Sequence, residues 1–379
     1  MSKQSLHKKR LNLFVFLVLL YLLSGCIKEN DAAPLPSLKE PTSPSKGDQV
    51  GEEKSIVPIE IKNGSFSMVA GWLDDNTIVY VTDSNEGSTV YSYGLQDGEK
   101  RELFHSDFPI ADILISPSRK HLLIHSAPSS NEAKLVIITN TGEEIYSEII
   151  PSTELSLKWS PFDEGNILLT AFTEDWNFSI WNLDIKSGKK AELSLPQPFG
   201  TWLDREKLLY LDWDLENPSL TTRTKQFDLR SEESHDILEG IYLVDSFRDA
   251  VITVAPDNEH DQDAVYTFYT HELEETYSFR APRLTRYSDW LVPYYTYLEG
   301  QQRFLSFQPL YSTEADVYSE GFQLISIDLD TGDEEVLLEG LENEPLSCSP
   351  DGKRCLSGFY LEKLIDLESK KIQTLVEME

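Results

Sequence analysis

The sequence feature that most constrains the fold is a repeat of about 43 residues. Each copy begins with a bulky apolar residue, continues through a turn and ends in a dense apolar run. Copies begin at Trp72, Ile115, Trp159, Trp202, Val244 and Cys348, and the first four intervals are 43, 44, 43 and 42 residues. A near-constant period of this length indicates a repeat array. The 104 residues between Val244 and Cys348 leave room for two units, with a degraded copy at 297–307 between them.

A second pattern follows the first in most copies: an alternating strand, a turn and a charged strand. The turns carry Asp-x-x-Ser/Thr-Gly, as at 184–188 and 328–332, which is hairpin chemistry because Asp and Ser bond their own backbone and Gly takes positive φ. The second strand is apolar on consecutive residues, as in 208–211, which predicts burial on both faces. Four-stranded sheets with covered inner strands and a solvated outer strand predict an all-β fold, a β-propeller.

We count seven four-stranded units, and six blades is the alternative. The units span 69–108, 110–150, 154–196, 199–240, 241–281, 283–340 and 341–379. The unit at 283–340 is the least regular of the seven. The propeller domain is predicted over 56–379, and the extended segment 55–63 is expected to pair with the last blade and close the ring.

The N-terminal residues are predicted to be a targeting signal and not a part of the folded domain. Residues 1–25 have a basic start and an apolar run of thirteen residues, which is too short to span a bilayer as a helix. The run ends in Leu23-Ser24-Gly25-Cys26, which closely resembles the bacterial lipoprotein signal. The resemblance implies cleavage after Gly25 and a diacylglycerol on Cys26, with fatty acids such as palmitate as the membrane anchor. A plain signal anchor with an incidental cysteine is the alternative.

The segment 26–55 is rich in Pro, Ser, Lys and Glu and predicts a disordered tether. The formal charge of the whole chain is −32, and it becomes −36 when the four positive charges of residues 1–25 are removed. Such an acidic chain is repelled by phosphates, so nucleic-acid binding is not expected. The predicted location is the extracytoplasmic face of the cell membrane.

Several short motifs resemble known propeller repeats. S-P-D-G-K-R at 349–354, S-P-S-R-K at 116–120 and the Asp-x-x-Ser/Thr-Gly corners resemble TolB-type propeller repeats. Together with the lipoprotein signal and the tether, they resemble the YqgU-like lipoproteins of Gram-positive bacteria. The resemblance implies a location and a propeller fold, classed as six-bladed, and it implies no activity.

No catalytic, metal or cofactor motif is found. G-x-S-x-G, G-x-x-x-x-G-K-[ST], C-x-x-C and H-E-x-x-H are all absent, and the acidic loop 257–263 is interpreted as a solvated hairpin loop. The predicted function is a monomeric, non-catalytic binding module for a protein, peptide or glycan. The alternative is a cell-envelope hydrolase or lyase that uses carboxylates from several blades.

Cys348 and Cys355 flank the Pro-Asp-Gly turn of the last unit. A two-residue turn at Asp351-Gly352 would place them directly opposite each other and within bonding range. A three-residue turn with a bulge would offset them by one position. The sequence therefore leaves a disulfide between them open.

Overall fold

The computed structural model describes residues 56–62, 64–257, 259–260, 262–287 and 289–377. The chain divides into two units, Met1–Glu53 and Lys54–Glu379, and the described residues belong to the second. The predicted signal peptide and Cys26 lie outside the described residues, as does the tether. In the described part, the 3-10 turn η1 (Ala315–Val317) is the single helical element. No helix there is long and apolar enough to cross a membrane.

Most strands form four-stranded sheets of consecutive strands. Sheet 1 contains β2 (Ser65–Trp72), β3 (Thr77–Ser84), β4 (Gly87–Gly94) and β5 (Lys100–Ser106). Sheet 2 contains β6 (Ile110–Ile115), β7 (His121–Ser129), β8 (Glu132–Thr139) and β9 (Glu144–Pro151). Sheet 3 contains β10 (Glu154–Trp159), β11 (Asn166–Phe172), β12 (Phe178–Asp184) and β13 (Lys189–Glu192). Sheet 4 contains β14 (Gly200–Trp202), β15 (Lys207–Leu211), β16 (Thr222–Asp228) and β17 (Ser234–Ile241).

The remaining sheets include two small ones. Sheet 5 contains β18 (Leu243–Ser246), β19 (Val251–Pro256), β20 (Asp263–Tyr269) and β21 (Glu275–Pro282). Sheet 6 contains β24 (Tyr295–Leu298), β25 (Arg303–Gln308), β27 (Phe322–Asp328) and β28 (Glu334–Leu341). Sheet 7 contains β29 (Leu346–Cys348), β30 (Arg354–Ser357), β31 (Lys363–Asp366) and β32 (Lys371–Thr374). The small sheets are β22 (Leu284–Thr285) with β23 (Trp290–Leu291) and β26 (Thr313–Glu314), and β1 (Ile59–Glu60) with β33 (Val376–Glu377).

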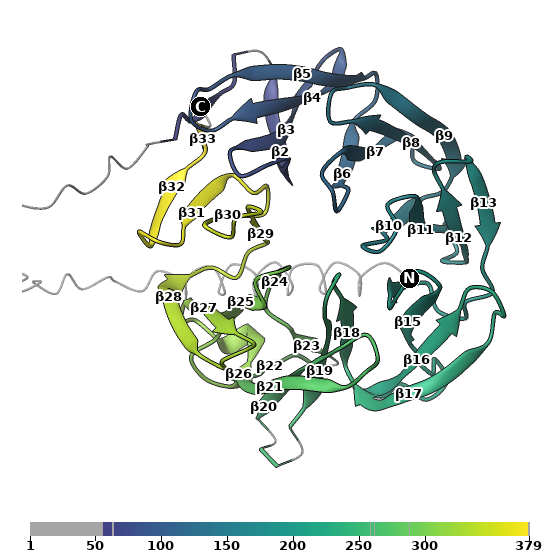
Figure 1. Cartoon of the computed structure of the whole chain (residues 1–379), viewed down its shortest axis with the longest axis vertical. Coiled ribbons are helices and arrows are strands. Elements are labelled where there is room, and N and C mark those ends of the chain that lie inside the picture. The colour runs from purple at the N-terminus through teal and green to yellow at the C-terminus, as the bar shows by residue number, and fades with distance from the viewer. Residues whose placement is uncertain (1–55, 63, 258, 261, 288, 378–379) are drawn as a thin grey trace, which may run out of the picture. The chain divides into compact units, whose positions relative to one another are not determined.

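The seven four-stranded sheets are arranged radially around a centre. Figure 1 shows the first strands, such as β2, β6 and β10, next to the centre and the fourth strands, such as β5 and β9, at the periphery. Within each sheet, neighbouring strands are antiparallel. The all-β propeller predicted from the repeat is confirmed.

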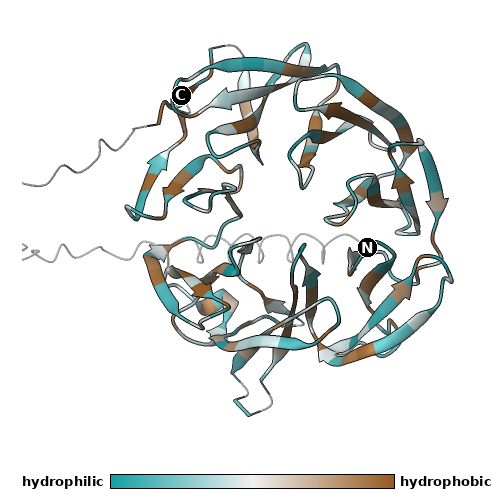
Figure 2. Ribbon diagram, in the orientation of Figure 1, coloured by the Kyte–Doolittle hydropathy of each residue, from teal (hydrophilic) through white to brown (hydrophobic). Residues whose placement is uncertain are grey.

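Burial follows the order of the strands within each sheet. The second strands are covered on both faces, as predicted, and Leu208, Leu209 and Tyr210 of β15 are all buried. The fourth strands carry many exposed side chains, as in β5 and β17. Figure 2 shows the same contrast, with hydrophobic stretches in the inner strands and more hydrophilic residues on the outer ones. Neighbouring sheets therefore bury their inner strands against each other, and this packing fixes the ring.

The ring closes between sheet 1 and sheet 7. The segment 55–63 was expected to pair with the last blade and close the ring, and β1 does pair, in parallel, with β33, which lies in the predicted last unit 341–379 just beyond the four strands of sheet 7. The buried Ile59 stabilises this pairing, because it fills the core between the two sheets together with Leu375. Each four-stranded sheet is made of strands from one stretch of sequence, so no strand is exchanged across the closure.

Hydrogen bonds complete the closure, which we call the seam. The Trp72 Nε1 donates to Ser347 O at 2.9 Å, and Asp351 N donates to Asp75 Oδ1 at 2.8 Å. The Arg354 guanidinium donates to Asp75 O and, at 2.8 Å, to Asn76 Oδ1. The hairpin that carries the two cysteines is therefore the part of sheet 7 that holds sheet 1.

The loops alternate between two faces because the strands in each sheet are antiparallel. Loops from first to second and from third to fourth strands, such as 116–120 and 185–188, lie on what we call the hairpin face. Loops from second to third strands, and the links to the next sheet, lie on the crossover face; 173–177 and 193–199 are examples.

The unit expected at 283–340 contains an elaboration. Strands β22, β23 and β26 form a small sheet beside sheet 6, and β22 pairs with β26 in parallel. The aromatic stretch 290–297 lies in this irregular unit, and its Trp290 and Tyr297 are buried. Trp290 is buried, stacks on Tyr242 with ring centroids 4.5 Å apart, and lies under the Arg283 guanidinium at 4.6 Å.

Candidate functional site

The most prominent concave feature is a cavity of about 980 Å³ at the centre of the ring, toward the hairpin face. Six of the seven four-stranded sheets contribute to its wall through their first strands and the loops that follow them. Apolar side chains such as Ile113, Ile115 and Leu298 line part of the wall. The volume lies within the range of small-molecule sites, and such sites combine apolar walls with a few polar groups.

Four charged residues line this cavity. The two carboxylates accept hydrogen bonds from neighbouring groups: Glu299 from Arg248 N at 3.0 Å, and Asp249 from Gly300 N at 2.9 Å. The guanidinium groups of Arg119 and Arg248 form no hydrogen bond, ion pair or ring contact with the described residues. The cavity is therefore lined by two arginines whose guanidinium groups are not engaged by the protein, together with two carboxylates that are.

Arg119 has an uncommon backbone conformation. Its φ is 62°, in the left-handed region that L-residues other than Gly seldom adopt. The turn S-P-S-R-K at 116–120 corresponds to S-P-D-G-K at 349–353, where Gly352 has a φ of 65°. The same turn is thus built with Gly in sheet 7 and with Arg in sheet 2.

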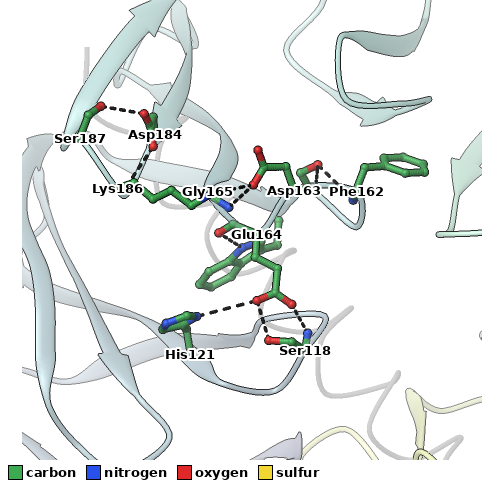
Figure 3. A network of polar contacts seen from close by, with 11 residues as sticks. Ser118, His121, Phe162, Asp163, Glu164, Gly165, Asp184, Lys186 and Ser187 are labelled. Atoms are coloured by element: carbon green, nitrogen blue, oxygen red, sulfur yellow. Dashed lines mark hydrogen bonds and ion pairs between the residues drawn. The ribbon is translucent and has the colours of Figure 1, made fainter.

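The cavity wall is braced between sheets 2 and 3 by a polar network (Figure 3). The Glu164 carboxylate accepts from Ser118 N and, at 2.5 Å, from Ser118 Oγ, while the Trp159 Nε1 donates to Glu164 O at 3.0 Å. Asp163 accepts from Lys186 Nζ at 3.2 Å in the same network. These contacts hold the 116–120 turn, and with it Arg119, at the edge of the cavity.

A second groove of about 400 Å³ lies toward the crossover face. Its charged centre is Asp245, which accepts from Lys158 Nζ at 2.5 Å and from Thr201 Oγ1 and Tyr295 Oη at 3.4 Å each. These four side chains come from the first strands of sheets 3, 4, 5 and 6. Burial, and then the charge of Asp245, raise the pKa of Tyr295 well above its usual value, so the phenol stays protonated.

Exposed aromatic side chains adjoin this groove. Trp176 is 70% exposed and Phe199 is 63% exposed, and both pack against the buried Phe172, with ring centroids 6.1 and 5.7 Å from it. Phe199 also lines the groove. A set of exposed rings beside a groove is a common feature of binding surfaces.

The structure joins Cys348 and Cys355 in a disulfide, with the Cα atoms 3.9 Å apart. The cysteines are register partners, as a two-residue turn would make them, but the loop is longer. Ser349 N donates to Arg354 O at 2.7 Å, so four residues, 350–353, form the loop. An even number of loop residues keeps the two cysteines opposite each other.

The structure also shows the surroundings of the tryptophans that begin three of the repeats and of the acidic loop 257–263. Trp72, Trp159 and Trp202 are buried, so these repeated tryptophans serve packing. Asp257, in the acidic loop, accepts from Arg280 Nε at 2.5 Å and from Glu259 N at 2.9 Å. No group of three or more His, Cys, Asp or Glu among the described residues could hold a metal ion.

Comparison with known proteins decides the family. The model for the YqgU-like 6-bladed beta propeller domain matches residues 94–358 of the sequence. The chain belongs to this family. The matched residues begin at the end of β4 and end just after β30. The description of the YqgU-like family counts six blades, whereas the described residues here form seven four-stranded sheets.

Relatives agree with the YqgU-like assignment. The uncharacterized lipoprotein YqgU of Bacillus subtilis (strain 168) is 24% identical over 359 residues, which cover 95% of both chains. The structure of the uncharacterized protein lmo1340 from Listeria monocytogenes EGD-e is similar with a TM-score of 0.79 and 23% identity, over 86% of this chain and 98% of that one. The beta-propeller domain of the Trilobed protease from Pyrococcus furiosus is similar at a TM-score of 0.55 and 13% identity, over 83% and 99% of the two chains. That domain is described as having an open velcro topology.

The arginine pair is what sequence reasoning missed. Arg119 and Arg248 lie on sheets 2 and 5, and no local motif connects them. Aligning the turns 116–120 and 349–353 would have singled out Arg119, because an arginine there stands at a glycine position.

Proposed function

We propose that this chain is a lipid-anchored, extracytoplasmic propeller that acts as a non-catalytic binding module. Its membrane anchor is the diacylglycerol on Cys26, after cleavage of residues 1–25, and residues 26–55 are the tether. The lipoprotein relative, 24% identical over nearly the whole chain, supports this location. The ring has seven blades in this proposal, supported by the seven four-stranded sheets. An experimental structure with six such sheets would correct that count.

The observation that carries the binding function is the central cavity of about 980 Å³. Residues from six sheets meet there, so its shape depends on the whole ring and not on one loop. The carboxylates Asp245, Asp249 and Glu299 each accept hydrogen bonds from neighbouring protein groups. These hydrogen bonds fix the three carboxylates in place and so help to hold the shape of the two hollows that they line.

Site-specific photo-crosslinking in cells tests the binding function. A photoreactive amino acid is placed at Thr296, which lines the cavity, at Phe199 on the crossover face, and at Glu102 on the outer strand β5 as a control. We expect a discrete adduct from Thr296 or Phe199 and none from Glu102. Adducts of equal yield from all three positions, or none from any, would contradict a binding module.

The same cells test the anchor. Metabolic labelling with a fatty-acid analogue should label the wild-type chain and leave Cys26→Ala unlabelled. Label that persists on Cys26→Ala would disprove lipidation at that residue. Loss of the crosslinked adduct in Cys26→Ala would further show that the ligand is met at the membrane.

A further inference from the structure

The central cavity presents two arginines, beside two carboxylates, in a chain that is strongly acidic. The chain has 65 Asp and Glu against 33 Lys and Arg, so carboxylates outnumber the cations by about two to one. Lys158, Lys190 and Lys363 have carboxylate partners, with Nζ to carboxylate distances of 2.5, 2.6 and 2.8 Å. Arg119 and Arg248 line the cavity and have no such partner among the described residues. Their position, and not the composition, makes them available to a ligand.

The backbone conformation of Arg119 is unfavourable for a residue with a side chain. Its φ of 62° disfavours a side chain, and the equivalent turn in sheet 7 uses Gly352 at 65°. Its backbone N donates to Ser116 O at 2.8 Å and its carbonyl accepts from Asn140 Nδ2 at 3.2 Å, bonds that a glycine would also form, whereas its guanidinium has no partner among the described residues. Arg119 thus adopts an unfavourable backbone conformation and its side chain has no partner in the protein. At the edge of a cavity, this combination indicates a role in binding.

The other residues of the cavity wall indicate what the rest of the ligand would be. Ile113, Leu114 and Ile115 of sheet 2 and Leu298 of sheet 6 also line the cavity and supply apolar surface. Arginine binds carboxylate and phosphate through two parallel hydrogen bonds, while an apolar wall favours hydrocarbon. Glu299 and Asp249 line the same cavity, so a ligand with several negative charges would be repelled.

We propose that the hairpin-face cavity binds a small amphiphilic anion, with one carboxylate or phosphate group held by Arg119 and Arg248 and an apolar body against the isoleucine and leucine wall. This inference rests on the proposed binding function and names the class of its ligand. The anion belongs either to a lipid-like molecule or to a free small acid, and the probes below separate these sources.

Isothermal titration calorimetry tests the proposal on the mature chain, residues 26–379, with Cys26→Ala so that no detergent is needed. The probes are decanoate and decyl phosphate below their micelle concentrations, with decanol, decyltrimethylammonium and inorganic phosphate for comparison. We expect both amphiphilic anions to bind and the neutral and cationic analogues to bind at least tenfold more weakly. Equal affinity for inorganic phosphate would overturn the amphiphile assignment, and equal affinity for decanol would overturn the role of charge.

The variants separate binding from folding. Arg119→Gly restores the residue that the equivalent turn uses, so it should raise the melting temperature while it weakens decanoate binding at least tenfold. Lys370→Gly is the matched control, since it also removes a cation from a residue with positive φ (56°) but lies outside the cavity. It should leave binding unchanged. Unaltered binding by the double variant Arg119→Gly, Arg248→Ala would overturn the proposal, and if Thr296 still yields an adduct while no anion binds, only this inference fails.

Discussion

Removing the disulfide between Cys348 and Cys355 should destabilise the propeller by an amount that the structure allows one to work out. The cysteines are 7 positions apart, so the bond closes a short loop. For a loop of about eight residues, the chain-entropy relation gives a loss of about 2.5 kcal/mol of unfolding free energy at 25 °C. A domain of this length has an unfolding entropy near 0.7 kcal/mol/K, so the melting temperature should fall by about 4 °C.

Two comparisons isolate the bond from the side chains. The first is the wild type with and without reductant, which changes the bond alone. The second is the double variant Cys348→Ala, Cys355→Ala, which also loses the sulfur contacts of the buried Cys355 and so should melt slightly lower. Calorimetry or circular dichroism gives the melting temperatures, and alkylation of the unfolded, unreduced chain shows whether the two thiols are free.

The result that refutes the reasoning is an equal response to reductant in the wild type and the double variant. Alkylation of both cysteines without prior reduction would refute it independently. A fall in melting temperature well above 4 °C would indicate a second effect of the disulfide. It would mean that the bond also stabilises the seam in the folded state, where the same hairpin holds Asp75 and Asn76.

Three further predictions concern single side chains. Arg354→Met should lower the unfolding free energy by about 1–2 kcal/mol, because it removes donors across the seam, and by more than Arg101→Met at an exposed contact; urea denaturation measures both. Asp112→Asn should stabilise the fold only slightly at pH 7, because loss of hydration raises the pKa of this carboxyl but the side chain is exposed and solvent screens the effect; the gain should vanish below about pH 4, where the carboxyl is protonated in the folded and the unfolded chain. Asp257→Asn should reduce the loss of stability in acid. Hydrogen bonds from Glu259 N and Arg280 hold the pKa of Asp257 below its usual 3.8. The stability that the ionised carboxylate contributes is therefore present above pH 4 and is lost as pH falls toward the lowered pKa. Unfolding curves against pH that run parallel to the wild type would contradict the last two predictions.

The sequence revealed the parts of the fold that are local. A second strand such as 208–211 is apolar on both faces because both faces are covered, and the Asp-x-x-Ser/Thr-Gly corners form turns from their own side chains. Those signals lie within a few residues of each other, so they can be read from a single chain.

The closure and the cavity could not be inferred in this way. The partner of Ile59 is Val376, more than three hundred positions away, and two-residue strands carry no recognisable pattern. The cavity is likewise formed by short segments from six sheets, each unremarkable within its own repeat. Of the cavity residues, only the arginine at the glycine position of the 116–120 turn could have been recognised from the sequence.

The absence of strand exchange across the seam has a consequence for biosynthesis. Each four-stranded sheet uses consecutive residues, so sheets can form one after another as the chain emerges, with contacts that are close in sequence. Closure must wait until Val376, in the last described strand, is available to pair with Ile59. A chain that stops before sheet 7 would keep six sheets and leave Trp72 without its acceptor at Ser347 or its covering core. An unclosed ring therefore exposes a hydrophobic edge, which makes such fragments natural targets for proteolysis.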